Sequence, residues 1–428
     1  MSRPAASLRQ TASPLAGSLL AAALGQGALV VSGVLVFRLL GPRDRGYLGL
    51  IVLFPAVLGQ LGSLGLPLAA TYYLSRQRER SAAIVRLLAS AAVAQAAVLL
   101  LLHAGILAAV FWSDPHLVRI AALISLPAVP AILAQSYGIA VLQGEQRFAA
   151  FNVLRTVPAA AYAAVVLAIY LGGSGNLEWV VVGWICSSVA SGLATLVLAV
   201  RPLRHAEPAG EPPSLRELLR FGLRGLLGWT SPIETFRLDQ AIVGLFLSPA
   251  ALGYYLAGLA FASLPRFLAQ SVGYIAYPRI AARSGDEARS ELRQFFWLAA
   301  GGAALVVAGL ELVVPQLGRF FFGADFGGAV DLTRILLVGA LFLAARRILT
   351  DGAQGLGRPG LGTVAELASW VFLLPALAIF TPLLGARGVA LALTLSAALS
   401  FGVLLLLVSG RRAVPRIRPG FLAARGTE

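Results

Sequence analysis

The chain has 428 residues, of which 58% are hydrophobic and 12% are charged, and its mean hydropathy is +0.82. Soluble domains carry about a quarter charged residues, so this composition excludes a soluble globular protein. The net charge of +15 is high enough for a nucleic-acid-binding protein. The arginines, however, form short clusters between apolar runs, which is typical of loops in membrane proteins and argues against nucleic acid as a partner.

Apolar runs of membrane-spanning length recur along the whole chain. A bilayer core needs about 20 apolar residues per helix, and stretches such as 180–200 and 391–408 contain no Asp, Glu or Arg. Turns rich in Gly, Pro and charge separate the runs. The sequence therefore predicts an all-α polytopic membrane protein of about twelve transmembrane helices. The expected spans are 15–37, 47–73, 84–112, 117–142, 153–171, 178–200, 219–247, 250–277, 295–317, 331–350, 362–382 and 386–408.

Arginine is distributed unequally between alternate loops. Most of it lies in the two terminal segments and in the loops or flanks 75–86, 144–155, 201–224, 279–293 and 346–358. Positive residues stay on the cytoplasmic side of a membrane. All basic residues are Arg, and Ala, Gly and Pro are abundant, which indicates a GC-rich bacterial genome. We therefore expect a multi-pass protein of the bacterial cytoplasmic membrane with both termini in the cytoplasm.

The second half of the chain repeats landmarks of the first half. Such a repeat indicates two six-helix lobes, expected at 1–207 and 208–428. Six spans per lobe insert both lobes the same way up, which predicts a pseudo-two-fold axis along the membrane normal and a central cleft suited to alternating access. The repeated landmarks are Pro42-x3-Gly46-Tyr47 with Pro249-x3-Gly253-Tyr254, offset by 207, and Gln143-Gly144-x-x-Arg147 with Gln354-Gly355-x-x-Arg358, offset by 211.

The expected span 219–247 carries three charges where charge is costly. Each of Glu234, Arg237 and Asp239 costs about 2.5–3.5 kcal/mol at a helix centre on insertion scales, and Arg266 lies within the next span. On a continuous helix Glu234 and Arg237 share a face, so Asp239 needs a partner on another helix or water. These charges either form ion pairs that hold the helices together, or Arg237 and Arg266 line a wet cleft and bind an anion. In a further interpretation, Glu234 or Asp239 binds a coupling proton or sodium ion.

The sequence contains no constellation that is typical of an enzyme. It has three His and one Cys, Cys186, and their spacing matches no metal-binding pattern. A Walker phosphate-binding loop requires Lys, which is absent. The sequence therefore predicts a protein that is not an enzyme and that uses no metal or cofactor, so an ion gradient, the membrane potential or the substrate gradient must drive any transport.

Several short motifs occur in a recognisable order. They are Phe37-Arg38-Leu-Leu-Gly41-Pro42-x3-Gly46-Tyr47, Leu142-Gln143-Gly144 followed by Arg147-Phe148, and Arg237-Leu238-Asp239-Gln240. In this order they resemble the Wzx-type flippases of lipid-linked oligosaccharides. These flippases belong to the multidrug/oligosaccharidyl-lipid/polysaccharide exporter superfamily, and the resemblance covers most of the chain.

The resemblance implies translocation of an undecaprenyl-pyrophosphate-linked oligosaccharide across the cytoplasmic membrane for surface polysaccharide synthesis. We expect Arg237, Arg266 and Arg38 to bind the pyrophosphate, and Asp239 or Glu234 to orient an arginine or bind the coupling ion. The partners implied are the lipid-linked substrate, membrane lipid and polysaccharide assembly enzymes. Two alternatives stay open: a cation-coupled multidrug exporter of the same superfamily, and a membrane-embedded glycosyltransferase or polymerase, which the short outward loops disfavour.

Overall fold

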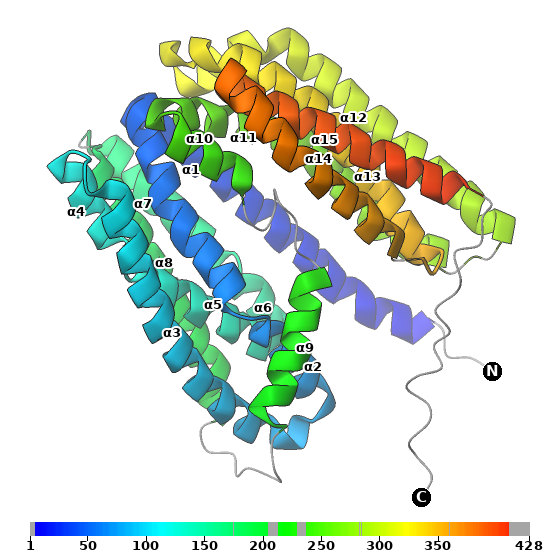
Figure 1. Cartoon of the computed structure of the whole chain (residues 1–428). Helices are drawn as coiled ribbons and strands as arrows, with labels where there is room; N and C mark the ends of the chain where they lie inside the picture. The colour runs from blue at the N-terminus through cyan, green and yellow to red at the C-terminus, as the bar shows by residue number, and fades with distance from the viewer. Residues whose placement is uncertain are drawn as a thin grey trace, which may run out of the picture. The chain divides into compact units, whose positions relative to one another are not determined.

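The computed structural model describes residues 5–173, 175–203, 213–228, 237–281, 283, 285–358 and 360–410. In this part of the chain all regular structure is helical, and no β-strand occurs (Figure 1). Nine of the described helical segments are long and apolar enough to cross a membrane. The first of them contains parts of two expected spans, 15–37 and 47–73, joined at a kink. The prediction of an all-α polytopic membrane protein is confirmed.

Most helices in the described part of the chain follow one another with short connections. In chain order they are α1 (Ala5–Gly62), α2 (Leu66–Arg76), α3 (Ser81–Phe111), α4 (His116–Ile124), α5 (Ala128–Gly144), α6 (Phe148–Leu154), α7 (Val157–Leu171), α8 (Leu177–Val200), α9 (Leu215–Gly228), α10 (Leu238–Phe246), α11 (Pro249–Ala281), α12 (Gly285–Phe322), α13 (Val330–Gly355), α14 (Gly360–Leu384) and α15 (Ala386–Ser409). Three short 3-10 turns lie between them, at Arg78–Arg80, Arg201–Leu203 and Ala324–Ala329.

Two compact units can be distinguished by the proximity of their residues. The first comprises Met1–Ala260 and Pro315–Val330, and the second comprises Phe261–Val314 and Asp331–Glu428. Helices α11 and α12 each contribute residues to both units. The division into sequence lobes 1–207 and 208–428 stays a prediction.

Helix α1 of the first unit is bent where the sequence places a Gly-Pro pair. Gly41 has φ 66° and ψ −177°, a conformation that favours glycine, and the helix resumes at Pro42. The expected span 47–73 is interrupted once more before α2, where Leu64 and Gly65 have φ values of 52° and 70°. This span therefore consists of two helical pieces, and the break coincides with a glycine.

The repeated Pro-x3-Gly landmarks contact each other within the first unit. A Cβ atom at Gly46 would overlap the carbonyl oxygen of Pro249 and lie 2.9 Å from its Cα. A Cβ atom at Gly253 would overlap the carbonyl oxygen of Pro42 and lie 3.0 Å from its Cα. The glycine of each copy of the motif therefore packs against the backbone of the proline in the other copy. We call this pair of contacts the reciprocal glycine seam.

Small residues allow other helices of the first unit to approach closely. A Cβ atom at Gly192 of α8 would lie 2.6 Å from the carbonyl oxygen of Ala131 in α5, and one at Gly138 of α5 would lie 2.9 Å from the Thr195 side chain. Small residues at helix contacts are characteristic of membrane proteins, in which van der Waals packing takes the place of the hydrophobic effect. These contacts fix α5 beside α8.

Helix α9 is amphipathic and packs on α2 of the first unit (Figure 1). The rings of Phe221 and Tyr72 stack with centroids 4.4 Å apart, and Leu218 is fully buried. Gly222 meets the backbone of Gly65 at the break before α2. The expected span 219–247 is therefore not covered by one continuous helix: α9 and α10 are separate, and residues 229–236 between them lie outside the described residues.

The second repeated landmark ends its helix in the same way in each copy. In the first unit, the Arg147 N–H donates to Leu142 O at 2.8 Å and the preceding residue, Gln146, has φ 58°. In the second unit, the Arg358 N–H donates to Ala353 O at 2.8 Å and the preceding residue is Gly357, with φ 73°. Both are Schellman-type helix ends. The shared geometry supports the internal repeat at an offset of 211.

Candidate functional site

Two of the charges expected in the middle of a span, Arg237 and Asp239, lie instead at the start of a short helix. Arg237 is the N-cap of α10 and has φ 47° and ψ 43°, in the left-handed region that non-glycine residues rarely adopt. The expectation that Arg237 lies inside a continuous helix is wrong, and so is the angle to Asp239 derived from it. Broken helices line the substrate or ion sites of many transporters, and strained backbone is concentrated at functional sites.

Asp239 has found a partner on another helix, as expected. Its side chain is 1% exposed, and its Oδ2 accepts a hydrogen bond of 2.9 Å from the hydroxyl of Tyr255, which is fully buried in α11. The other carboxylate oxygen, Oδ1, is buried and has no hydrogen-bond partner in the described part of the chain. Position in the first turn of α10 favours a negative charge at Asp239, because the N-terminus of a helix is partially positive.

Arg38 binds the end of a helix. Its Nε donates to Phe321 O at 2.7 Å, and its Nη2 donates to Phe320 O. Both carbonyls belong to the last turn of α12, where a cation satisfies carbonyl groups that the helix leaves unpaired. Phe37 next to it contacts Phe322 edge to face at 4.9 Å. This geometry gives Arg38 a structural role, and its role in substrate binding stays a prediction.

The remaining predicted site residues are not brought together by the described part of the structure. Arg266 lies in α11, is half-buried and takes part in an interaction of its own. Arg237 belongs to the first unit and Arg266 to the second, so a shared anion site formed by these two residues stays a prediction. Glu234 lies outside the described residues.

A cavity of about 590 Å³ lies within the first unit, between α2, α5, α8 and the start of α7. Its volume falls in the range of about 300–1,000 Å³ that is usual for ligand sites. Most of its wall is apolar, and among the described residues no Asp or Glu lines it. Its polar lining consists of Thr71, Gln135, Ser136, Gln143, Arg155 and Ser188.

The polar groups of this cavity are held by local contacts. Gln135 Nε2 donates to Leu154 O at 2.9 Å, which fixes the amide beside the end of α6, while its Oε1 is buried without a partner among the described residues. The guanidinium carbon of Arg155 lies 5.3 Å from the centre of the Phe151 ring. The sequence alone does not mark these residues as candidates for a site, because Gln135 lies in an apolar run and Arg155 belongs to a basic loop.

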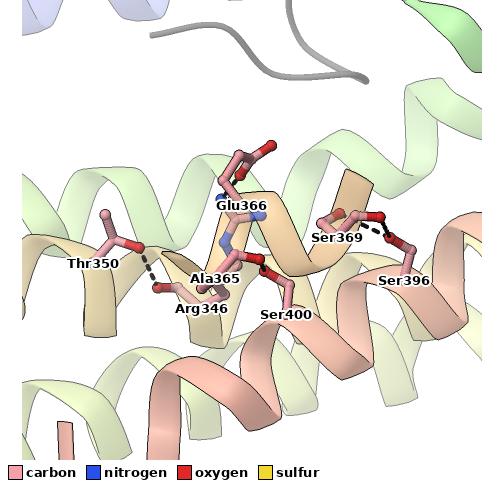
Figure 2. Close-up of polar contacts among 7 residues, drawn as sticks. All are labelled: Arg346, Thr350, Ala365, Glu366, Ser369, Ser396 and Ser400. Carbon is pink, nitrogen blue, oxygen red and sulfur yellow. Dashed lines mark hydrogen bonds and ion pairs between the residues drawn. The ribbon is translucent and has the colours of Figure 1, made fainter. Parts of the chain in front are cut away.

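A polar network joins three helices of the second unit, and Figure 2 shows it. Arg346 of α13 forms an ion pair with Glu366 of α14, and both side chains are largely buried. The hydroxyls of Ser369 and Ser396 lie 2.8 Å apart, and Ser400 donates to Ala365 O at 2.8 Å. Because the ion pair is neutral overall and its members satisfy each other, we interpret the network as a connection between α13, α14 and α15.

The family of the chain follows from comparison with known proteins. Residues 35–326, more than half of the chain, match a family described as polysaccharide biosynthesis protein. The chain belongs to this family. No curated protein matches it at a significant level. The membership confirms the resemblance drawn from the sequence motifs.

Solved structures of membrane transporters share the fold of this family member. A multidrug resistance transporter of the MATE family and MOP superfamily, in an inward-facing conformation, is 18% identical with a TM-score of 0.72, covering 91% of this chain and 97% of its own. The lipid II flippase MurJ, in an inward closed conformation, is 15% identical with a TM-score of 0.70, covering 92% of this chain and 87% of its own. At these identities the similarity establishes the fold, and it leaves the substrate open.

Proposed function

We propose that the chain is a flippase that moves an undecaprenyl-pyrophosphate-linked oligosaccharide across the bacterial cytoplasmic membrane by alternating access. Membership of the polysaccharide biosynthesis family is the observation that carries this proposal. The fold supports it, because two solved proteins of this fold are a multidrug transporter and the lipid II flippase MurJ. On this proposal the protein is a transporter and not an enzyme.

The chemistry of the substrate agrees with the polar groups of the chain. A pyrophosphate needs cationic partners, and the planar fork of arginine binds two of its oxygens at once. Arg237 and Arg266 are the proposed contacts, and Arg38 is a third that would have to leave the carbonyls of α12. The lipid tail can remain in the bilayer throughout transport.

Asp239 is the proposed site of the coupling ion. Its carboxylate is buried and keeps one oxygen without a partner in the described residues, while Tyr255 holds the other. Carboxylates inside a membrane are costly and mark ion or proton pathways. Glu234 is the second candidate, and either carboxylate could orient Arg237 instead.

A multidrug exporter is the competing function, because a MATE transporter shares the fold. Exporters of cationic drugs need carboxylates in the substrate site, whereas the cavity of the first unit is lined by a cation and by no described carboxylate. This difference favours an anionic substrate.

The decisive experiment is deletion of the gene, followed by localisation of lipid-linked repeat units. We expect them to accumulate on the cytoplasmic leaflet, and accumulation on the outer leaflet would point to a polymerase. The variant Arg237→Ala should abolish surface polysaccharide while the protein remains in the membrane. Normal surface polysaccharide in this variant would remove Arg237 from the site.

The proposed orientation can be tested in the same cells. Cys186 is the only cysteine, so Cys186→Ala provides a background for single-cysteine labelling. Ser75→Cys should react with a membrane-impermeant maleimide only after the cells are opened, and Ser113→Cys should react in intact cells. Both side chains are exposed, so the opposite pattern would reverse the orientation.

A further inference from the structure

The cavity of the first unit is elongated and follows one face of α5. Its lining residues on this helix run from Ala131 to Gln143, a length of about 18 Å at the helical rise of 1.5 Å per residue. The polar side chains on this face of α5 are Gln135, Ser136 and Gln143. Gln143 stands at the end of α5, beside the loop 144–155 that the arginine distribution assigns to the cytoplasm, so the cavity extends toward the side from which a substrate enters.

The polar groups restrict which ligand the cavity can hold. A cationic ligand would be repelled by Arg155 and would find no counter-charge, because no described carboxylate lines the wall. A purely apolar ligand would leave polar groups of the wall, such as the Ser136 hydroxyl and the Gln143 amide, without hydrogen-bond partners, which is unfavourable. Amides donate and accept hydrogen bonds, as sugar hydroxyls do, and arginine matches the oxygens of a phosphate.

We propose that this cavity is a binding compartment for the sugar-pyrophosphate head group, located within the first unit. Arg155 binds an anionic oxygen of the pyrophosphate, and the amide of Gln143 binds a sugar hydroxyl. The apolar wall of the cavity faces the non-polar faces of the sugar rings. This inference rests on the proposed flippase function and deepens it, because it adds a site that does not depend on Arg237 or Arg266.

Binding to the purified full-length chain in detergent tests the compartment. The probes are undecaprenyl pyrophosphate, the same lipid carrying one N-acetylglucosamine, and phosphatidylglycerol. Arg155→Gln should weaken both pyrophosphate lipids by about tenfold or more, as expected for a charge-assisted hydrogen bond. Gln143→Leu should weaken the sugar-bearing lipid alone. Arg201→Gln, a control at an exposed arginine outside the cavity, should bind all probes like the wild type.

Several results would overturn the proposal. Unchanged affinity of Arg155→Gln for the pyrophosphate lipids would exclude Arg155 as their contact. Equal loss of phosphatidylglycerol binding would make the cavity a general site for anionic lipid. Equal affinity of the wild type for the two pyrophosphate lipids would exclude sugar recognition by the Gln143 amide.

A chemical block after folding avoids variants that fail to fold. In the Cys186→Ala background, Ser136→Cys places one thiol in the cavity wall. Alkylation with N-ethylmaleimide should lower the amount of undecaprenyl pyrophosphate bound, because only the contacts at Arg237 and Arg266 remain, and the bound lipid should slow the alkylation. Lipid binding that is unchanged by alkylation would overturn the compartment while leaving the flippase function intact. The flippase function itself fails if the wild type does not bind pyrophosphate lipid and the gene deletion leaves export normal.

Discussion

Replacement of Gly46 by alanine tests the reciprocal glycine seam directly. The new Cβ would overlap the carbonyl oxygen of Pro249, and the neighbouring atoms are backbone, so no side-chain rotation can relieve the overlap. Overpacking of this kind costs about 1–3 kcal/mol. We therefore expect Gly46→Ala to unfold at a clearly lower temperature than the wild type when the purified protein is heated in detergent and its tryptophan fluorescence is followed.

Gly33→Ala is the matched control in the same helix. A Cβ atom at Gly33 meets no heavy atom within 4 Å, and alanine stabilises a helix by up to about 1 kcal/mol relative to glycine. Gly33→Ala should therefore unfold at the wild-type temperature or slightly above it. Equal unfolding temperatures for Gly46→Ala and Gly33→Ala would refute the seam.

The reciprocity of the seam makes a second measurement informative. Gly253→Ala should destabilise the protein as Gly46→Ala does, because its Cβ would overlap the backbone of Pro42. Once either substitution has separated the two segments, the other should cost less, so the double variant should be less destabilised than the sum of the single variants. Simple additivity would mean that the two contacts are independent.

Other substitutions test the remaining contacts. Tyr255→Phe removes the donor to the buried Asp239 carboxylate and should cost about 1–3 kcal/mol; an unchanged unfolding temperature would show that this hydrogen bond contributes nothing. Arg346→Ala leaves Glu366 unpaired in the second unit and should lower the free energy of unfolding by less than the roughly 3–5 kcal/mol expected for a fully buried pair. The double variant Arg346→Ala/Glu366→Ala should recover part of this loss when its unfolding is measured. Gly65→Ala should destabilise the break before α2, because its φ of 70° strains alanine, and a wild-type unfolding temperature would contradict this.

The fold could be predicted because its signals are local. A membrane helix must satisfy its own backbone hydrogen bonds, so length and hydropathy alone locate the spans. The repeat was visible because the close contacts at Gly46 and Gly253 and the helix ends before Arg147 and Arg358 require particular residues. The structure contains these contacts and these helix ends.

The candidate site was predicted less well, because sequence spacing assumes a continuous helix. Arg237 lies at the start of a helix, and its direction relative to Asp239 could not be derived from 100° per residue. The cavity depends on residues that are distant in sequence. Nothing local to Gln135 indicates that the end of α6 will lie beside it, so a glutamine in an apolar run could not be distinguished from an ordinary contact between helices.

The exchange of partners in the reciprocal glycine seam has a consequence for the origin of the chain. In this seam, the glycine of each segment contacts the proline of the other segment. A contact with this two-fold reciprocity is called isologous and is the type found in symmetric homodimers. An ancestral protein of half the length, with a single Pro-x3-Gly motif, would already have carried both surfaces needed to join a second copy of itself. Fusion of two such copies would keep the contact and would require no new one. After fusion, a residue larger than glycine at either position would still overlap the proline of the other copy.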